Sequence, residues 1–268
     1  MRRIAILSIS IIAALPAFSQ TPATAPPAGA MGASGAVAPK GPHPKSAAEN
    51  NALVAMMKTA DPAAQAKAAE DFLKTYPDTD YKSQTLLIEA QAYHAQKQDP
   101  KAIVAGEAAL DVDPKSYDTL LLLSEIYSRS TKATDLDMDD KLAKADKYAK
   151  EALDLLAKAE KPKADLPDAD WAAAKQSEES RGYLSLGFSA LLHKKYDDAK
   201  TNFNKGIAMY PDPLDMLYIE RAYTDVKRYD DALAWIDKAA ASPNANDTVK
   251  RITGSDKTRV EGLKKQSQ

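Results

Sequence analysis

The sequence predicts an all-α fold, an α-solenoid of stacked helical hairpins. From residue 47 to the C-terminal end, apolar residues recur at i, i+3, i+4 and i+7, the spacing of one face of a helix. These segments are separated by Pro or Asp, and none shows the alternation that is typical of a strand. A single helix pair cannot bury its own apolar stripe, so several pairs are expected to stack and share one core.

These signals predict eleven helices joined by short turns. Their expected ranges are 47–60, 63–76, 81–97, 101–111, 116–130, 139–159, 168–194, 196–210, 214–227, 229–241 and 247–265. Such a succession of antiparallel helices indicates an internal repeat.

The chain is similar to itself at a spacing of 34 residues. Ala68 recurs as Ala102, and Phe72 recurs as Gly106. Five copies share these offsets of small residues, large apolar residues and prolines, and the further members are Ala109, Pro114, Ala145, Ala149, Ala152, Gly187, Ala199, Phe203, Gly206, Pro211, Ala232, Ile236 and Ala239. Small residues shorten the distance between crossing helices, and aromatic residues fill the remaining space.

This pattern resembles the tetratricopeptide-repeat family, and the best match is at Leu186-Gly187, Ala199, Phe203 and Pro211. The resemblance implies about five helix pairs. The amphipathic stretch that follows them, with Val249, Ile252, Val260 and Leu263, fits a C-terminal capping helix. Two departures from the family pattern are expected to interrupt the repeat: an insertion near residues 130–139 and a break between Pro162 and Pro167.

The resemblance also implies a concave groove, lined by the first helix of each pair, that binds a protein or peptide partner. It places fourteen residues there: Gln84, Leu87, Gln91, His94, Asp118, Leu121, Glu125, Arg129, Arg181, Leu184, Phe188, Leu191, Leu217 and Arg221. The Lys/Asn clamp with which some family members hold a C-terminal carboxylate is missing, because Asp118 and Glu125 would repel that anion.

The first nineteen residues are expected to be a signal peptide. Arg2 and Arg3 precede an apolar run from Ile4 to Leu15, and the small residues Ala17 and Ser19 suit cleavage before Gln20. The apolar run is shorter than the roughly 20 residues of a permanent membrane helix. These features are typical of an exported bacterial protein that is periplasmic or secreted after cleavage.

Residues 20–46 are expected to form a flexible linker before a folded domain at 47–266. The stretch is rich in Pro, Ala and Gly and carries few large apolar side chains, so it cannot offset the entropy of ordering. His43 within it fits the composition of a linker better than a role as a ligand.

The composition argues against several classes of function. The net charge is −2, and it becomes more negative without Arg2 and Arg3, so no basic field for nucleic acid is expected. The chain has no cysteine, which removes disulfides, thiolate metal sites and cysteine nucleophiles. No cofactor is expected.

Neither a metal site nor a catalytic site is expected. Residues 135–139 alternate carboxylates as a calcium loop does, but Asp140 stands where that loop needs Gly and Asp146 where it needs Glu. Common nucleophile, zinc and nucleotide motifs are absent from the sequence, and His94 and His193 lie in different repeats. The sequence therefore favours a binding protein over an enzyme.

Two binding functions remain open. Phe72-Leu73, followed by residues 76–79 and Tyr81, is similar to a helix-turn of repeat proteins in outer-membrane assembly and envelope division complexes, which favours a scaffold or adaptor in the cell envelope. The alternative is a ligand-binding or substrate-binding accessory module of a secreted enzyme system.

Cleavage of the signal peptide is a testable expectation. The protein purified from its own cells should begin at Gln20, because the residues before it meet the requirements of the export signal. N-terminal sequencing and the intact mass would both report the cut. A chain that still begins at Met1 in the cytoplasm would contradict it.

Overall fold

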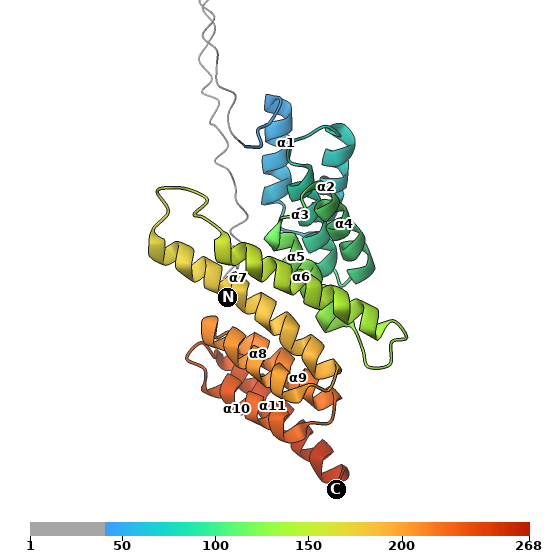
Figure 1. The fold of residues 1–268 in the computed structure, drawn as a ribbon, viewed down its shortest axis with the longest axis vertical. Helices are drawn as coiled ribbons and strands as arrows, with labels where there is room; N and C mark the ends of the chain where they lie inside the picture. The colour runs from blue at the N-terminus through green and yellow to red at the C-terminus, as the bar shows by residue number, and fades with distance from the viewer. Residues whose placement is uncertain (1–40) are drawn as a thin grey trace, which may run out of the picture. The chain divides into compact units, whose positions relative to one another are not determined.

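The structure, a computed structural model, describes residues 41–268; the predicted signal peptide and linker residues 20–40 lie outside the described residues. The described part forms eleven helices and no strand, so all eleven predicted helices are confirmed. They are α1 (Ala47–Lys58), α2 (Pro62–Thr75), α3 (Lys82–Ala95), α4 (Asp99–Val112), α5 (Tyr117–Ser130), α6 (Met138–Lys158), α7 (Asp168–Leu192), α8 (Tyr196–Met209), α9 (Pro213–Asp225), α10 (Tyr229–Ala241) and α11 (Asp247–Gln266) (Figure 1).

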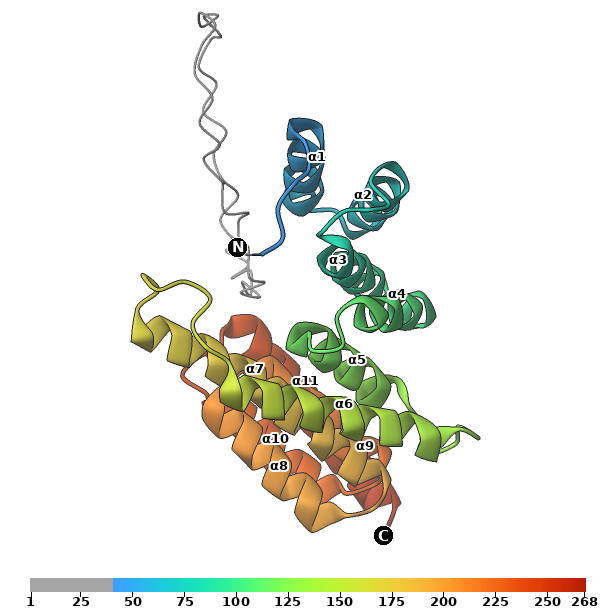
Figure 2. The same ribbon diagram turned by 45° about the horizontal axis from the view of Figure 1, so that its top comes forward.

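The helices group into two compact units, which are described separately below. Unit 1 ends at Val112 and holds α1 to α4, in which α3 packs between α2 and α4. Unit 2 begins at Asp113 and holds the pairs α5/α6, α7/α8 and α9/α10, followed by α11, which packs on α10 and α9 (Figure 2). The expected all-α architecture of helix pairs with a C-terminal capping helix is confirmed.

Side-chain caps set the start of several helices. Ser46, Asp61 and Asn246 each accept a hydrogen bond from the backbone N–H three residues later, at the first turns of α1, α2 and α11. Pro62 and Pro213 occupy the first helical positions of α2 and α9, where the missing N–H is not needed. These local signals explain why helix positions are readable from the sequence.

Three first helices end in the same way. Lys97, Lys194 and Lys227 follow α3, α7 and α9 and adopt φ values of 62°, 60° and 60°, in the left-handed region. Their backbone N–H groups and those of the next residues bond back to carbonyls of the last helical turn. The turn therefore repeats in both units although lysine, not glycine, occupies it.

Close helix approach organises the core of unit 2. Gly187 on α7 faces Phe203 on α8, and a Cβ added at Gly187 would lie 2.4 Å from a ring carbon of Phe203. The Phe203 ring centroid lies 5.0 Å from that of Phe188, 5.9 Å from Tyr223 and 6.3 Å from Trp235, all in edge-to-face contacts. One aromatic ring thus joins α7 and α8 to the next helix pair.

Unit 1 has a smaller core around Leu53, Met56 and Phe72. Residues 42–45, near the end of the predicted linker, contact its α2–α3 turn. The Tyr81 hydroxyl donates to the Pro42 carbonyl at 3.0 Å, and the backbone N–H of Lys45 donates to Glu49 Oε2 at 2.6 Å. Residues 42–45 are therefore hydrogen-bonded to unit 1 before α1 begins.

No helix among residues 41–268 combines the length and hydropathy needed to cross a bilayer.

Two glycine substitutions should have opposite effects on unit 2. Gly187→Ala is expected to destabilise the unit by about 1–3 kcal/mol, because the added methyl would displace the fully buried Phe203 ring. Gly254→Ala on α11 meets no atom within 4 Å and should stabilise by about 0.5–1 kcal/mol through helix propensity. Urea unfolding followed by tryptophan fluorescence would measure both, and a Gly187→Ala protein as stable as wild type would contradict the packing argument.

Candidate functional site

The structure places the predicted groove residues on the first helix of four pairs. In unit 1, α3 carries Gln84, Leu87, Gln91 and His94; in unit 2, α5 carries Asp118, Leu121, Glu125 and Arg129, α7 carries Arg181, Leu184, Phe188 and Leu191, and α9 carries Leu217 and Arg221. The apolar members are buried between helices: Leu87, Leu121, Leu184, Phe188, Leu191 and Leu217. These six side chains therefore belong to the core and are not available to a partner. The partner groove as a whole stays a prediction.

In unit 1 the predicted residues are polar and only partly available. Gln84 is exposed, whereas Gln91 and His94 are half-buried. The His94 Nδ1 lies 2.8 Å from Asp99 Oδ1, at the start of α4, so the imidazole is held by its own repeat.

In unit 2 five charged residues form one connected network of ion pairs, here called the charged ladder: Glu125, Arg129, Glu178, Arg181 and Asp215. Glu125 is its centre, because it pairs with Arg181 on α7 at 3.2 Å and with Arg129 on its own helix at 3.3 Å. Arg181 also pairs with Glu178 at 2.7 Å. Arg129 also pairs with Asp215 on α9 at 2.9 Å. The ladder therefore ties α5, α7 and α9 together.

These ion pairs are largely shielded from solvent, which strengthens the attraction between their charges. The four paired side chains at the centre, Glu125, Arg129, Arg181 and Asp215, expose between 19% and 26% of their surface. Burial by itself would lower the pKa of Arg129, but Glu125 and Asp215 outweigh it and raise that pKa. Arg129 also lies over the rings of Phe188 and Tyr218, 5.2 Å and 4.8 Å from their centroids. The guanidiniums of Arg129 and Arg181 are thus held in place by their carboxylate partners.

Asp118 lies beside the ladder, where it interacts with the charges of Glu178 and Arg181. Burial, and then the nearby Glu178, raise the pKa of Asp118 to about 7, while Arg181 acts in the opposite direction. The carboxylates of Asp118 and Glu178 both interact with the Arg181 guanidinium, which also pairs with Glu125. Asp118 therefore gains or loses a proton near neutral pH.

A surface on α9, called the α9 stripe, was predicted at Arg221 but not at its two exposed apolar residues, Leu214 and Tyr218. It consists of Leu214, Tyr218 and Arg221, which lie at i, i+4 and i+7 on one face of the helix. Leu214 exposes 51% of its surface and Tyr218 exposes 44%, and the Arg221 side chain is 53% exposed. Tyr218 lies against Arg129 of the ladder. Sequence reasoning selected Leu217, which is buried. The sequence indicates that α9 starts near Pro213. It does not indicate which face of α9 the neighbouring helices cover.

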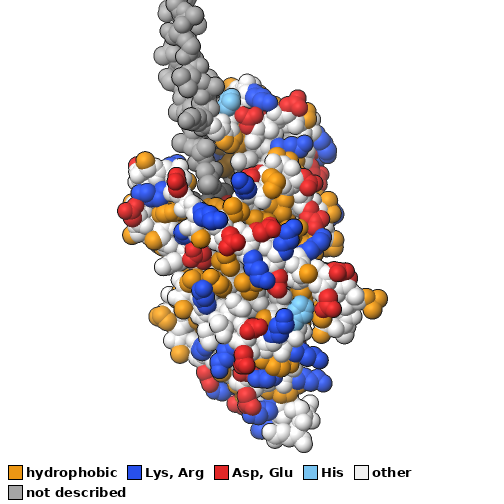
Figure 3. Space-filling model, in the orientation of Figure 1, with side chains coloured by type: hydrophobic (Ala, Val, Ile, Leu, Met, Phe, Trp, Pro, Cys, Tyr) orange, Lys and Arg blue, Asp and Glu red, His pale blue; other side chains and the backbone are white. Residues whose placement is uncertain are grey.

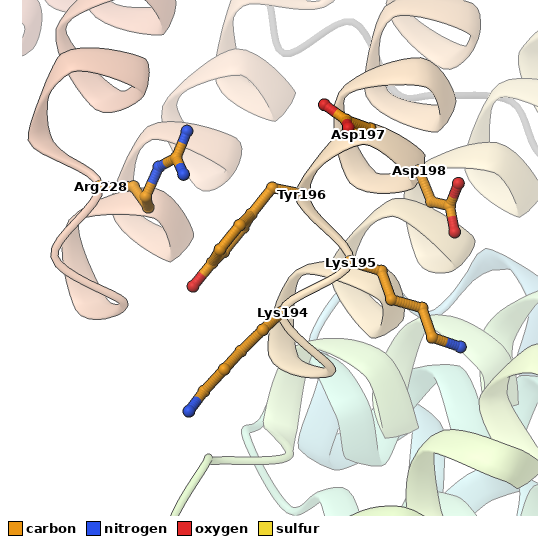
Figure 4. A pocket seen from close by; sticks show the side chains of 6 residues that line it. All are labelled: Lys194, Lys195, Tyr196, Asp197, Asp198 and Arg228. Atoms are coloured by element: carbon orange, nitrogen blue, oxygen red, sulfur yellow. The ribbon is translucent and has the colours of Figure 1, made fainter.

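A surface hollow of 460 Å³ lies where the α7–α8 and α9–α10 turns meet (Figure 4). Its lining is Lys194, Lys195, Tyr196, Asp197, Asp198 and Arg228. In Figure 4 the Lys195 and Asp198 side chains point away from those of Lys194 and Tyr196, so the charges do not converge on one point. Arg228 is already paired with Asp231 at 2.6 Å and stacked over Tyr196 at 4.4 Å. The hollow is therefore best described as a solvent-filled depression between two turns.

One lysine pairs with two carboxylates of the acidic segment before α6. The Lys141 ammonium lies 3.1 Å from Asp135 and 2.9 Å from Asp137. No group of three or more histidine, aspartate or glutamate side chains within residues 41–268 has the arrangement of a metal site.

Comparisons with known proteins agree with this fold. No protein-family model matches the chain, and no curated protein matches it. Among solved structures, TTC0263, a thermophilic TPR protein of Thermus thermophilus, is similar over 77% of this chain and 97% of its own, with a TM-score of 0.53 and 18% identity. The fold is therefore that of tetratricopeptide-repeat proteins.

A second solved structure is more distant. The assembly chaperone of RpL4 (Acl4, residues 1–338) aligns over 82% of this chain and 99% of its own, with a TM-score of 0.37 and 10% identity. That likeness is too low to carry an argument about fold or function.

Asp118→Asn should change how the stability of unit 2 depends on pH. The pKa of Asp118 is about 7 in the fold and about 3.9 in an unfolded chain. Its contribution to stability is therefore full below about pH 4 and is lost as the pH rises through about 7. The variant should match wild type near pH 4 and exceed it by up to about 4 kcal/mol at pH 8.

Urea unfolding from pH 4 to 8, followed by tryptophan fluorescence, would test this. Asp165→Asn, at an exposed carboxylate in the α6–α7 loop, is the matched control and should follow wild type throughout. A constant difference between Asp118→Asn and wild type across this pH range would show that Asp118 keeps an ordinary pKa.

Proposed function

We propose that the protein is a non-catalytic interaction scaffold or adaptor that works in the cell envelope after export. The observation that carries this proposal is the α9 stripe of unit 2, an exposed leucine and tyrosine beside the fixed charges of the ladder. The tetratricopeptide fold supports the proposal, because solenoids of helix pairs present extended surfaces to other proteins.

The composition of the α9 stripe suits a protein interface. Tyrosine and arginine supply much of the binding energy in known interfaces, and the stripe exposes one of each beside Leu214. Tyr218 is backed by Arg129, which is itself paired with Asp215. A side chain that is held before binding loses less entropy when a partner arrives.

The partner proposed is a protein or peptide. On the face drawn in Figure 3, acidic and basic side chains are interspersed, with no large field of one sign over unit 2. Such mixed charge suits a surface that selects a partner by matching individual groups. It offers little to the phosphate backbone of a nucleic acid, whose binding needs a basic patch.

The envelope part of the proposal rests on the sequence. The N-terminal charge, apolar run and small residues before Gln20 meet the pattern of a signal peptide. The rival function, an accessory module of a secreted enzyme system, shares the export step and differs in what is bound.

A crosslinked pull-down from intact cells, with the protein tagged at its C-terminus, would test the proposal. Wild type should capture a small set of envelope proteins. The double variant Leu214→Ser, Tyr218→Ser should capture about tenfold less of each, because two exposed contact side chains are lost while the core is unchanged.

Leu136→Ser is the matched control, since Leu136 is fully exposed in the α5–α6 loop and lies outside the α9 stripe. It should capture the same proteins as wild type. Equal capture by the double variant would refute a role for the α9 stripe. Cytoplasmic partners would refute the envelope location, and a small molecule that raises the melting temperature without any protein partner would favour the accessory module.

A further inference from the structure

The surface of unit 2 that holds the ladder carries more negative than positive charge. Its charged side chains are the four carboxylates of Asp118, Glu125, Glu178 and Asp215 and the two guanidiniums of Arg129 and Arg181. When all of these groups are ionised, two negative charges are left without a positive charge of their own. The surface can therefore accept a positive charge from another molecule.

The excess of negative charge lies at the Asp118 end of this surface. Each carboxylate of the ladder has an arginine nitrogen within 3.3 Å. Among residues 41–268, no hydrogen bond or ion pair holds the Asp118 carboxylate, which interacts with Glu178 and Arg181 only through their charges. Asp118 is half-buried, so part of the side chain remains open to a partner.

The electrostatics of the neighbouring groups agree with this imbalance. Burial and then Glu178 raise the pKa of Asp118 to about 7, although Arg181 acts in the opposite direction. Burial by itself would lower the pKa of Arg181, but Glu125 and Glu178 outweigh it and raise that pKa. A further positive charge beside Asp118 would favour its ionised form and reduce its repulsion with Glu178.

We propose that the partner of unit 2 presents a lysine or arginine side chain that pairs with Asp118, while an apolar side chain of the same segment packs on Tyr218. This inference rests on the proposed function, because it states the chemistry of the partner that reaches the α9 stripe.

The two contacts are far enough apart to define a partner segment. Tyr218 lies against Arg129, which is on the same helix as Asp118. Eleven residues separate Asp118 from Arg129, which is about 16 Å along the axis of α5. An extended peptide covers about 16 Å with about five residues. The partner segment should therefore carry its basic residue about five positions from its apolar residue.

The ladder selects against an acidic partner. Arg129 and Arg181 are already paired with carboxylates of the same chain, so a partner carboxylate would have to compete for them. It would also be repelled by Asp118. A basic side chain breaks none of these pairs, because Asp118 has no pair to lose.

Two further charged groups lie at the α9 end, away from Asp118 along the chain of contacts. Arg221 lies 3.9 Å from Asp256 of α11, so its charge is partly offset. Asp212 accepts a hydrogen bond from the backbone N–H of Leu214 and caps α9. Neither supplies a positive charge to Asp118.

A peptide array probed with the purified full chain at pH 8, where Asp118 is ionised, tests the inference. The probes are synthetic peptides with one fixed leucine or tyrosine, in which every other position is varied in turn. Wild type should bind peptides with Lys or Arg about five positions from the apolar residue about tenfold more strongly than peptides with Asp or Glu there.

Variants at position 118 assign this preference to one carboxylate. Asp118→Lys should reverse the preference to Asp and Glu, and Asp118→Asn should remove it while binding through the apolar residue remains. Asp165→Lys changes an exposed carboxylate in the α6–α7 loop by the same charge and is the matched control, which should bind as wild type does. If Asp118→Lys does not fold, Asp118→Asn still decides the question, because it removes the charge at nearly constant shape.

The inference is overturned if wild type binds no peptide, shows no preference for a basic residue, or keeps that preference in Asp118→Asn. The pull-down with Leu214→Ser, Tyr218→Ser tests the proposed function separately. Reduced capture by that double variant, together with a basic preference that does not depend on Asp118, would leave the proposed function standing without this inference. Undiminished capture by the double variant would refute the role of the α9 stripe whatever the array shows.

Discussion

The packing of unit 2 depends on the contact between Gly187 and Phe203. No helix pair in a repeat protein can bury its own apolar face, so each pair needs a side chain that reaches into the next. Phe203 has this role: it lies on α8 against the bare backbone of α7, and its ring meets Tyr223 and Trp235 of the α9/α10 pair. Without the glycine the ring could not come this close, and the stacking of α7, α8, α9 and α10 would change together.

The polar surface of unit 2 is organised around that core. Because α5, α7 and α9 lie within reach of one another, the ladder can join Glu125, Arg129, Arg181 and Asp215 across three helices. Its two arginines are already paired with carboxylates of the same chain. The surface proposed for a partner is the α9 stripe, where Leu214 and Tyr218 are exposed and the Tyr218 ring packs against Arg129. Arg259 on α11 donates to Glu220 on α9, so α9 links the exposed surface to the capping helix.

The helices could be predicted from the sequence because their signals are local. Caps such as Asp61 and prolines such as Pro213 act within four residues, and the apolar spacing of each segment is set by the helix itself. The candidate site could be predicted only in outline. Arg129 and Arg181 both pair with Glu125, whereas Leu217 is buried while Leu214 and Tyr218, close by on the same helix, are exposed. Which side of a helix is covered depends on neighbours that the periodicity of one segment does not specify.

The sequence by itself determined the class of fold, the order of helices and the repeat of small and aromatic residues, because backbone hydrogen bonding and apolar spacing act between near neighbours in the chain. Only the tertiary structure decided which charges are partners. Arg129 and Asp215 are 86 residues apart, Arg181 and Glu125 are 56 apart, and Arg259 and Glu220 are 39 apart. Whether such groups meet, and whether a carboxylate oxygen such as Glu220 Oε2 is left buried without a donor, depends on distances and burial that exist only once the helices are packed.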